Sequence, residues 1–299
     1  MDLKQLSYFV TVIQEGTISG AARKLHLTQP PLSAQMKLLE EEAGCLLFER
    51  GSRHVQLTAA GQMLYGRAVK MLELADITAR ELKDYREGTA GVLRLGVVSS
   101  VGSTYLIHAV QDFQKQYPHI DFELTEGNTY QLLEQLSSGL IELALVRTPF
   151  SKQGLTSVPL IEEPLLAVGS KRYFQNKNSI TLSDLSGLPL ILYRRWEPIL
   201  LESFREAGLV PHVFCKNDDA RTSVIWADAG LGISILPASA FGLVKNPDTV
   251  SRQVSDLPLT SSICLVRSQD TWISTAARAF LNCLSKTYDH PLTKNTERS

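Results

Sequence analysis

The apolar positions of the first forty residues repeat with the 3.6-residue period of an α-helix. They are Leu3, Leu6, Phe9, Val10 and Ile13 in a first segment, and Ala21, Ala22 and Leu25 in a shorter second one. This spacing predicts a helix over residues 3–15 that ends at Gly16, and a second helix for which Thr17 supplies the N-cap. The small side chains of the second helix allow another helix to pack closely across a tight turn.

A third helix is predicted to begin at Gln29, after a turn at residues 26–28 in which Thr28 is placed as N-cap. Two prolines follow Gln29, and proline suits the first turn of a helix because its missing N–H would be unpaired there anyway. The residues expected to face the core are Leu32, Met36 and Leu39, and those left pointing outward are Gln29, Pro30, Ser33 and Lys37. Short polar groups near a helix N-terminus can read base edges, and a lysine further on suits a phosphate, so this is the layout of a DNA recognition helix.

Residues 45–58 consist of two short apolar stretches around a Gly-Ser-Arg tip, which predicts a β-hairpin wing with Arg50 and Arg53 near a DNA backbone. The whole chain has 30 basic and 31 acidic side chains, a formal charge of −1. Residues 20–39, in contrast, contain three basic side chains and no acidic one. A local basic face is what phosphate binding requires, so the overall charge does not oppose the DNA-binding prediction.

The motifs of this segment are A-A-R-K-L-H-L-T-Q-P-P-L-S at 21–33, L-L-E-E-E-A-G-C-L-L-F-E-R at 38–50 and L-T-A-A-G at 57–61. In order and spacing they resemble the winged helix-turn-helix of the LysR-type transcriptional regulators. The resemblance implies that Gln29, Pro30, Pro31 and Ser33 face the groove and that Lys37 and Arg53 lie toward phosphates. Ala34 stands where the family often has a basic residue, which implies a weaker salt dependence. The alternative is a small helical subdomain whose basic residues form a solvated face.

Residues 58–86 contain no proline and predict one long helix. Its apolar seam steps by four and three residues through Leu64, Ala68, Met71, Ala75, Thr78, Leu82 and Tyr85. Such a seam either packs on the chain's own core or pairs with the same helix of a second chain. Because the helix is followed by Gly-Thr-Ala-Gly at 88–91, a predicted hinge, we expect a homodimer through residues 64–85. Such a dimer would present two recognition helices to double-stranded DNA with dyad-related half-sites; the family resemblance also implies a homotetramer.

Beyond Gly91 the pattern changes to alternating strands and helices. The predicted strands are 92–98, 122–125, 141–146, 165–168, 188–193, 213–215, 233–236 and 263–267, and the predicted helices are 104–117, 129–138, 197–207, 221–229 and 271–288. Two such series predict two α/β lobes with mostly parallel sheets. Together with G-L-G-I-S-I-L-P at 230–237, they resemble the effector-binding domain of the same regulators, which is similar to periplasmic binding proteins.

The predicted fold is therefore α/β with an N-terminal all-α winged helix-turn-helix, a long linker helix and a two-lobed Rossmann-like effector-binding domain. The expected divisions are 1–58 for DNA binding, 59–90 for the linker helix and hinge, 91–290 for effector binding and 291–299 for a flexible tail. Within the third division, the first lobe is expected at about 91–161 plus 268–290 and the second at about 162–267.

Ligands of open α/β sheets bind beyond the carboxyl ends of the strands. The polar residues at those ends are Ser99, Ser100, Ser103, Thr104, Asn128, Thr129, Arg147, Thr148, Tyr193, Arg194 and Arg195. From these, the predicted effector site consists of Ser99, Ser100, Thr104, Asn128, Thr129, Arg147 and Arg194. The hydroxyls and the helix N-termini at these positions favour an anionic ligand, and Arg147 or Arg194 could bind its carboxylate with paired hydrogen bonds. A small organic acid is therefore the expected effector. The resemblance implies pocket roles for Ser99, for Asn128 or Thr129, and for Arg147. The alternatives are that the hydroxyls are helix caps and that Arg194 and Arg195 lie on an oligomer surface.

Several other classes of protein fit the sequence less well. No apolar run approaches the roughly 20 residues of a membrane span, and the N-terminus lacks a secretory signal pattern, so we expect a cytoplasmic protein. The four cysteines are far apart, which argues against a zinc or disulfide scaffold. With no catalytic, phosphate-loop or dinucleotide motif, we predict no enzyme activity, no catalytic residues, no metal and no cofactor. A solute-binding protein and an α/β enzyme are the rival classes to a transcriptional regulator that responds to a small anionic effector.

Overall fold

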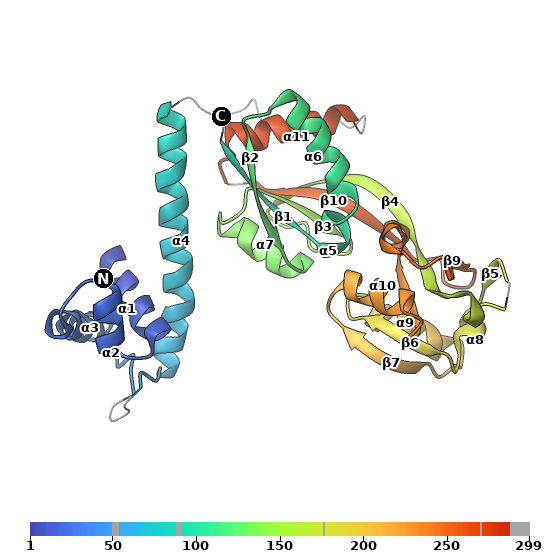
Figure 1. Ribbon diagram of the computed structural model, residues 1–299, viewed down its shortest axis with the longest axis horizontal. Helices are drawn as coiled ribbons and strands as arrows, with labels where there is room; N and C mark the ends of the chain where they lie inside the picture. Colours follow the sequence, from blue (N-terminus) through green and yellow to red (C-terminus); the bar gives the residue numbers. More distant parts are fainter. Residues whose placement is uncertain (50–53, 88–90, 176, 270, 288–299) are drawn as a thin grey trace. The chain divides into compact units, whose positions relative to one another are not determined.

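The computed structural model describes residues 1–49, 54–87, 91–175, 177–269 and 271–287. It divides into two compact units, Met1–Gly88 and Thr89–Ser299 (Figure 1). The predicted tail at 291–299 and the predicted wing tip lie outside the described residues. Among those that are described, no helix is long and apolar enough to cross a membrane.

The N-terminal unit is built from α1 (Leu3–Glu15), α2 (Ile18–Lys24), α3 (Gln29–Ala43) and α4 (Ala59–Glu87). Local capping sets the first boundaries: Asp2 and Gln5 form a capping box at the start of α1, and Gly16 ends it with φ 68°. The Thr17 hydroxyl accepts from the Gly20 N–H at the start of α2. The buried core of the unit contains Leu6, Phe9, Val10, Val12, Ala21, Ala22, Leu32, Met36, Leu39, Leu47 and Ala68. The predicted helices and the inward side of α3 are confirmed.

The predicted wing is present in its described part as an antiparallel pair. Phe48 bridges Leu57, and the Glu49 N–H donates to the Gln56 carbonyl at 2.9 Å. The Phe48 ring packs on Phe9 of α1, with centroids 5.5 Å apart. The base of the hairpin is thereby fixed to the helical core.

The apolar seam of α4 differs from the expectation in its first turns. Ala68 is fully buried in the core of its own unit, and Leu64 packs against that core. Met71 and Leu82 are instead 43% and 67% exposed, while the side chain of Tyr85 is outside the described set. The first two seam positions are therefore covered within the unit, where α4 packs against α1. Of the later seam positions, Met71 and Leu82 are open to another helix.

The first lobe of the C-terminal unit has a parallel three-stranded centre, with β1 paired to β2 on one side and β3 on the other. Its elements are β1 (Val92–Val97), α5 (Ser99–Gly102), α6 (Tyr105–Gln116), β2 (Asp121–Glu126), α7 (Thr129–Ser137), β3 (Leu143–Arg147) and the C-terminal helix α11 (Thr275–Thr287). Phe113 of α6 and Phe280 of α11 meet edge to face, 5.1 Å between centroids. Helix α11 thus returns to the first lobe, as expected.

The second lobe repeats the plan, with β6 paired in parallel to β7 and β8. Its elements are η1 (Lys171–Tyr173), β5 (Ser179–Ile180), α8 (Leu182–Leu185), β6 (Pro189–Tyr193), α9 (Glu197–Glu206), β7 (His212–Asn217), α10 (Ala220–Asp228), β8 (Ile233–Pro237), η2 (Ala238–Leu243) and β9 (Thr249–Val254). Trp196 and Phe204, each 1% exposed, are the largest fully buried side chains of its core.

Two long antiparallel strands, β4 (Leu155–Ser170) and β10 (Thr260–Ser268), connect the lobes. The strand order is β2-β1-β3-β10-β4-β8-β6-β7, so the sheet is mixed where a mostly parallel one was expected. The lobe division also differs: Ile263–Val266 of β10 pair with β3 and lie in the core of the first lobe, although residues up to 267 were assigned to the second. A strand that crosses between lobes has the same apolar pattern as one that stays within a lobe, so the pattern could not place it.

Candidate functional site

The DNA-facing residues predicted from the sequence gather on α3. Gln29, Pro30, Pro31, Ser33 and Lys37 are all exposed, while Leu32, Met36 and Leu39 of the same helix are buried. Gln29, Ser33 and Lys37 are spaced by four residues and so share one face. Arg53, the sixth predicted contact, lies outside the described residues.

The N-terminus of α3 is held in place by its neighbours. Thr28 occupies the N-cap position as expected, but its side chain makes no capping hydrogen bond. The Gln29 Oε1 accepts from the Ser19 hydroxyl of α2 at 3.2 Å, which orients the amide. Lys37 lies 3.6 Å from Glu41 in an exposed ion pair, and such pairs are weak enough for the ammonium to turn to a phosphate.

In the C-terminal unit, Arg147 lies at the end of β3 with its guanidinium 1% exposed. Its Nε donates to the Ser100 hydroxyl of α5 and its Nη2 to the Ser239 hydroxyl of η2, both at 2.9 Å. Its Nη1 lies 2.7 Å from Glu163 Oε1 on β4. Burial lowers the pKa of Arg147, and the Glu163 charge opposes that shift. Each of the three guanidinium nitrogens of Arg147 thus has a partner within the protein, and these partners come from both lobes.

Arg195 makes a second connection between the lobes. Its Nη1 donates to the Thr129 hydroxyl at 3.0 Å, and its Nη2 donates to the carbonyls of Arg147 and Pro149. Burial lowers the pKa of this guanidinium as well, and Thr129 is only 1% exposed. The contact joins the end of β6 to the start of α7.

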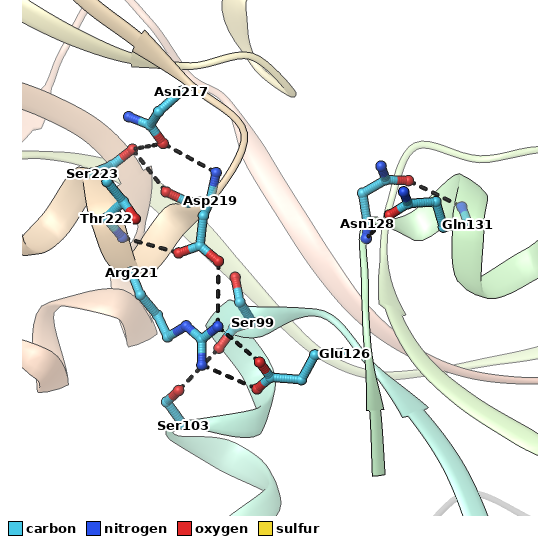
Figure 2. Close-up of polar contacts among 10 residues, drawn as sticks. All are labelled: Ser99, Ser103, Glu126, Asn128, Gln131, Asn217, Asp219, Arg221, Thr222 and Ser223. Atoms are coloured by element: carbon cyan, nitrogen blue, oxygen red, sulfur yellow. Dashed lines mark hydrogen bonds and ion pairs between the residues drawn. The ribbon is translucent and has the colours of Figure 1, made fainter. Parts of the chain in front are cut away.

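A third connection lies at the start of α10, shown in Figure 2. Arg221 donates to both carboxylate oxygens of Glu126 at the end of β2, at 3.1 and 2.8 Å, and lies 3.4 Å from Asp219. Burial acts against the charge of Arg221, but hydrogen bonds to Glu126 and the Asp219 charge raise its pKa overall. Side-chain exposures of 37% for Arg221 and 43% for Glu126 mean that this pair, unlike Arg147 and Glu163, is reached by solvent.

Asp219 is the N-cap of α10, and its carboxylate accepts from the Thr222 N–H at 2.9 Å. Burial by itself raises the pKa of Asp219. Hydrogen bonds from Thr222 and from the Ser99 hydroxyl, together with Arg221, outweigh that effect and lower it overall. Ser99 and Asp219 therefore link α5 of the first lobe to α10 of the second.

The remaining predicted effector residues have local roles. Asn128 caps α7 in a box with Gln131 (Figure 2), and the Thr104 hydroxyl donates to the Ser100 carbonyl at 2.9 Å. Arg194 is exposed and lies 3.3 Å from the exposed Asp218. The structure thus brings Ser99, Ser100, Thr129 and Arg147 to the region where the lobes meet, and leaves Arg194 at the surface.

The predicted effector site left out five residues that shape this region: Glu126, Glu163, Arg195, Asp219 and Arg221. Two of them had a local signal. Arg195 stands beside Arg194 after the same strand, and Asp219 precedes a predicted helix as an N-cap residue does. Glu126, Glu163 and Arg221 carried none. Arg221 and Glu126 meet across 95 residues of chain, and Glu163 meets Arg147 from a different strand.

Each of the two units matches a known protein family model. Residues 3–62 match the bacterial regulatory helix-turn-helix proteins of the lysR family, and residues 86–289 match the LysR substrate binding domain. The chain belongs to the LysR family of transcriptional regulators. As a LysR-family regulator it is a DNA-binding protein with a substrate-binding domain for an effector, and the family consists of regulators, not of enzymes.

Relatives of this LysR-family regulator match it over most of their length. The HTH-type transcriptional regulator AlsR of Bacillus subtilis (strain 168) is 30% identical over 283 residues, covering 90% of this chain and 91% of AlsR. The DNA-binding transcriptional dual regulator OxyR of Escherichia coli (strain K12) is 30% identical over 254 residues, which cover 84% of this chain and 83% of OxyR.

Solved structures of full-length regulators have the same fold. CbnR complexed with its target DNA superposes with a TM-score of 0.79 at 24% identity, over 96% of this chain and all of CbnR. Full-length BenM gives a TM-score of 0.56 at 26% identity, over 99% of this chain and 100% of BenM. The helical N-terminal unit and the mixed α/β unit together are therefore the architecture of a full-length LysR-type regulator.

Proposed function

We propose that this LysR-family regulator binds dyad-related half-sites as a homodimer or homotetramer, and that a small organic acid between the lobes of its C-terminal unit alters its action on DNA. The observation that carries the effector proposal is the solvent-reached Arg221–Glu126 pair, which lies beside Ser99 where the lobes meet. The exposed polar face of α3 supports the DNA proposal. The neighbour CbnR was solved with its target DNA.

The anchor that we propose for the effector is Arg221. Arg147 is buried with an internal partner on each guanidinium nitrogen, and Arg194 faces outward. Arg221, in contrast, presents two N–H groups to an exposed carboxylate, and a ligand carboxylate could replace Glu126 with the same paired geometry at little cost. Ser99, which lies beside Asp219, is the proposed hydroxyl partner next to this anchor. Ser100, Thr104, Asn128 and Thr129 remain proposed effector residues at the ends of β1 and β2, with Arg147 as the group that holds the lobe ends together.

Such a ligand would act on the regulator through the lobe contacts. Replacing Glu126 on Arg221 removes one side-chain connection between the lobes and leaves those of Arg147, Arg195 and Asp219 intact. A ligand shifts a conformational equilibrium by its difference in affinity for the two states. A change in lobe closure then alters how an oligomer spaces and bends its DNA.

DNA binding is tested with the full-length chain and fluorescent DNA from around its own gene, by anisotropy at low salt. We expect saturable binding, and an excess of unrelated DNA should displace the labelled DNA only weakly. Absence of any binding at low salt would overturn the regulator proposal for those sites.

The effector is tested by thermal unfolding with a panel of small mono- and dicarboxylates. A true ligand raises the apparent Tm by mass action. We expect the rise to be lost in Arg221→Gln and kept in the matched control Arg194→Gln, since both variants remove one exposed arginine from the same lobe. No rise with any carboxylate, or an equal loss in both variants, contradicts the proposed anion anchor.

A further inference from the structure

The first residue of helix α3 is tied to the preceding helix by a hydrogen bond between two side chains. The Ser19 hydroxyl of α2 donates to Gln29 Oε1 at 3.2 Å. Both residues are exposed, so the bond lies at the surface and contributes little to the stability of the buried core. One of its ends is the residue predicted to read a base, and this position points to a role in DNA recognition.

Ser19 stands on a fixed part of the backbone. The Thr17 hydroxyl accepts from the Gly20 N–H at 3.0 Å, and Gly20 itself is buried. Across the turn from α2 to α3, the Leu27 N–H donates to the Ala22 carbonyl at 2.8 Å. Because the backbone is fixed on both sides of the side-chain hydrogen bond, the hydroxyl can hold the amide in one orientation.

The bond from Ser19 determines which groups of the Gln29 amide are left for DNA. A carbonyl oxygen has two lone pairs, and Ser19 uses one of those on Oε1. The second lone pair is open, and within the described part of the chain no group accepts from Nε2. Gln29 therefore presents one acceptor beside its N–H donors, in an order that Ser19 sets.

This order of acceptor and donor is complementary to the major-groove edge of adenine. Adenine has an acceptor at N7 and a donor at its N6 amino group, and a glutamine amide can bind both. Guanine has acceptors at both N7 and O6, so Oε1 in its present orientation would oppose O6. Turning the amide over to suit guanine would break the bond from the Ser19 hydroxyl. Gln29 is also the first residue of α3, the part of a recognition helix that reaches base edges.

We propose that Gln29 reads an adenine in each half-site and that Ser19 is its positioning residue, which holds the amide in the orientation that adenine requires. The inference rests on the DNA-binding part of the proposed function and deepens it by naming the base. A glutamine side chain loses rotamer freedom when it is ordered on a partner. One that is already held loses less, so Ser19 strengthens binding through Gln29 without touching DNA itself.

The base is identified by letting the full-length chain select its preferred site from a random pool of duplex DNA. We expect the sites selected by the wild type and by Gln29→Ala to differ at one A·T pair of each half-site, where the variant accepts other pairs. Ser19→Ala should relax the same pair, and Ser19→Thr, which keeps a hydroxyl, should restore it. Relaxation at a G·C pair, or at no pair, overturns the proposal. If the wild type selects no DNA, the proposed DNA binding fails as well.

Anisotropy titrations on the selected site test whether Ser19 acts through Gln29. Ser19→Ala should bind about two- to tenfold more weakly, the worth of one hydrogen bond, with an unchanged salt slope because no phosphate contact is lost. In the Gln29→Ala background the same substitution should cause no further loss. An equal loss in both backgrounds, or a smaller salt slope, would mean that Ser19 contacts DNA on its own and overturns the positioning role.

Modified bases test the adenine contact with the wild-type protein. At the selected pair, 7-deazaadenine lacks the N7 acceptor and purine lacks the N6 amino group, and each should weaken binding about fivefold or more. Neither should change binding to Gln29→Ala, and 7-deazaadenine at an adenine outside the site is the control. Undiminished binding of the wild type to both modified sites overturns the adenine contact. Thermal unfolding of Ser19→Ala should match the wild type, because Ser19 is exposed and Thr17 is the cap of α2.

Discussion

Arg147 and Glu163 form a buried ion pair, with 2.7 Å between Nη1 and Oε1 and side-chain exposures of 1% and 8%. The pair joins the end of β3 to the crossing strand β4. Removing one partner of a buried pair leaves an uncompensated charge, which costs about 3–5 kcal/mol, whereas removing both can cost little.

Arg147→Met and Glu163→Gln should therefore each destabilise the C-terminal unit by about 3–5 kcal/mol in urea unfolding. The double variant Arg147→Met with Glu163→Leu should lose much less unfolding free energy than the sum of the losses in the two single variants. Additive losses would show that the two side chains contribute independently and would contradict a coupled pair.

Two glycines of α4, five residues apart, should respond to alanine with opposite signs. A Cβ at Gly61 would meet the Leu47 carbonyl oxygen at 2.2 Å, whereas one at Gly66 meets nothing within 4 Å. Gly61→Ala should destabilise the N-terminal unit by about 1–3 kcal/mol through overpacking. Gly66→Ala should stabilise it by about 0.5–1 kcal/mol through helix propensity. Thermal unfolding of the full chain measures both, and stabilisation by Gly61→Ala would contradict the close approach.

Asp219 should make stability depend on acid pH. Its pKa in the folded protein is lowered from the ordinary 3.8 by hydrogen bonds and Arg221, against the effect of burial. The unfolded chain thus binds its proton more readily, so this stabilisation is complete above the unfolded pKa and is lost as pH falls through the folded one.

Asp219→Asn keeps a capping side chain and removes the charge. It should be less stable than the wild type at pH 7, and the difference should shrink as pH falls below about 4. Unfolding midpoints in urea at several pH values measure it. A difference that stays constant down to pH 3 would mean that the Asp219 charge contributes nothing.

The exposed face of α3 should divide into a residue that reads bases and one that neutralises phosphate. Gln29→Ala should relax the sequence preference, with a loss of about 1–3 kcal/mol of binding free energy on the preferred DNA site only. Lys37→Gln should weaken binding to all DNA and reduce the salt slope by about 1. Anisotropy titrations at several salt concentrations on preferred and unrelated DNA separate the two. Arg53→Gln is expected to behave like Lys37→Gln, and an unchanged slope in both would remove them from the DNA backbone.

The exposed part of the α4 seam should mediate self-association. Leu82→Glu introduces a charge at a seam position that is 67% exposed, and it should shift sedimentation toward the monomer. Val69→Glu is the matched control, because Val69 is 37% exposed on the same helix but lies next to the seam position Ala68 and outside the repeat. If both variants dissociate the oligomer, or neither does, the contact does not follow the seam.

The N-terminal unit could be predicted almost completely because its determinants are local. Helix starts depend on caps such as Asp2 and Thr17, helix ends on a glycine such as Gly16, and the inward side of α3 on the spacing of Leu32, Met36 and Leu39. Each of these is settled within a few residues of chain. The same holds for most of the strand and helix order of the C-terminal unit. The elements missed were α5, η1, β5, α8, η2, β9 and the first part of β4.

The candidate effector site could be predicted only in part. Strand ends located Ser99, Ser100, Thr129 and Arg147 correctly in the region where the lobes meet, because carboxyl ends of parallel strands share one edge of a sheet. Whether each arginine is buried, exposed or bound across the lobes could not be predicted from the sequence. Arg147, Arg194 and Arg195 have the same chemistry, and only their distant partners make one buried, one exposed and one a bridge.

The sequence by itself thus determined the family, the helix-turn-helix and its outward face, and the alternation that makes two α/β lobes, since periodicity and capping act over neighbouring residues. Tertiary structure decided that β4 and β10 cross between the lobes, that Leu64 and Ala68 are covered within their own unit, and that Glu163 holds Arg147. The physical reason is that burial and ion pairing depend on groups far apart in the chain, which meet only when the whole sheet has formed.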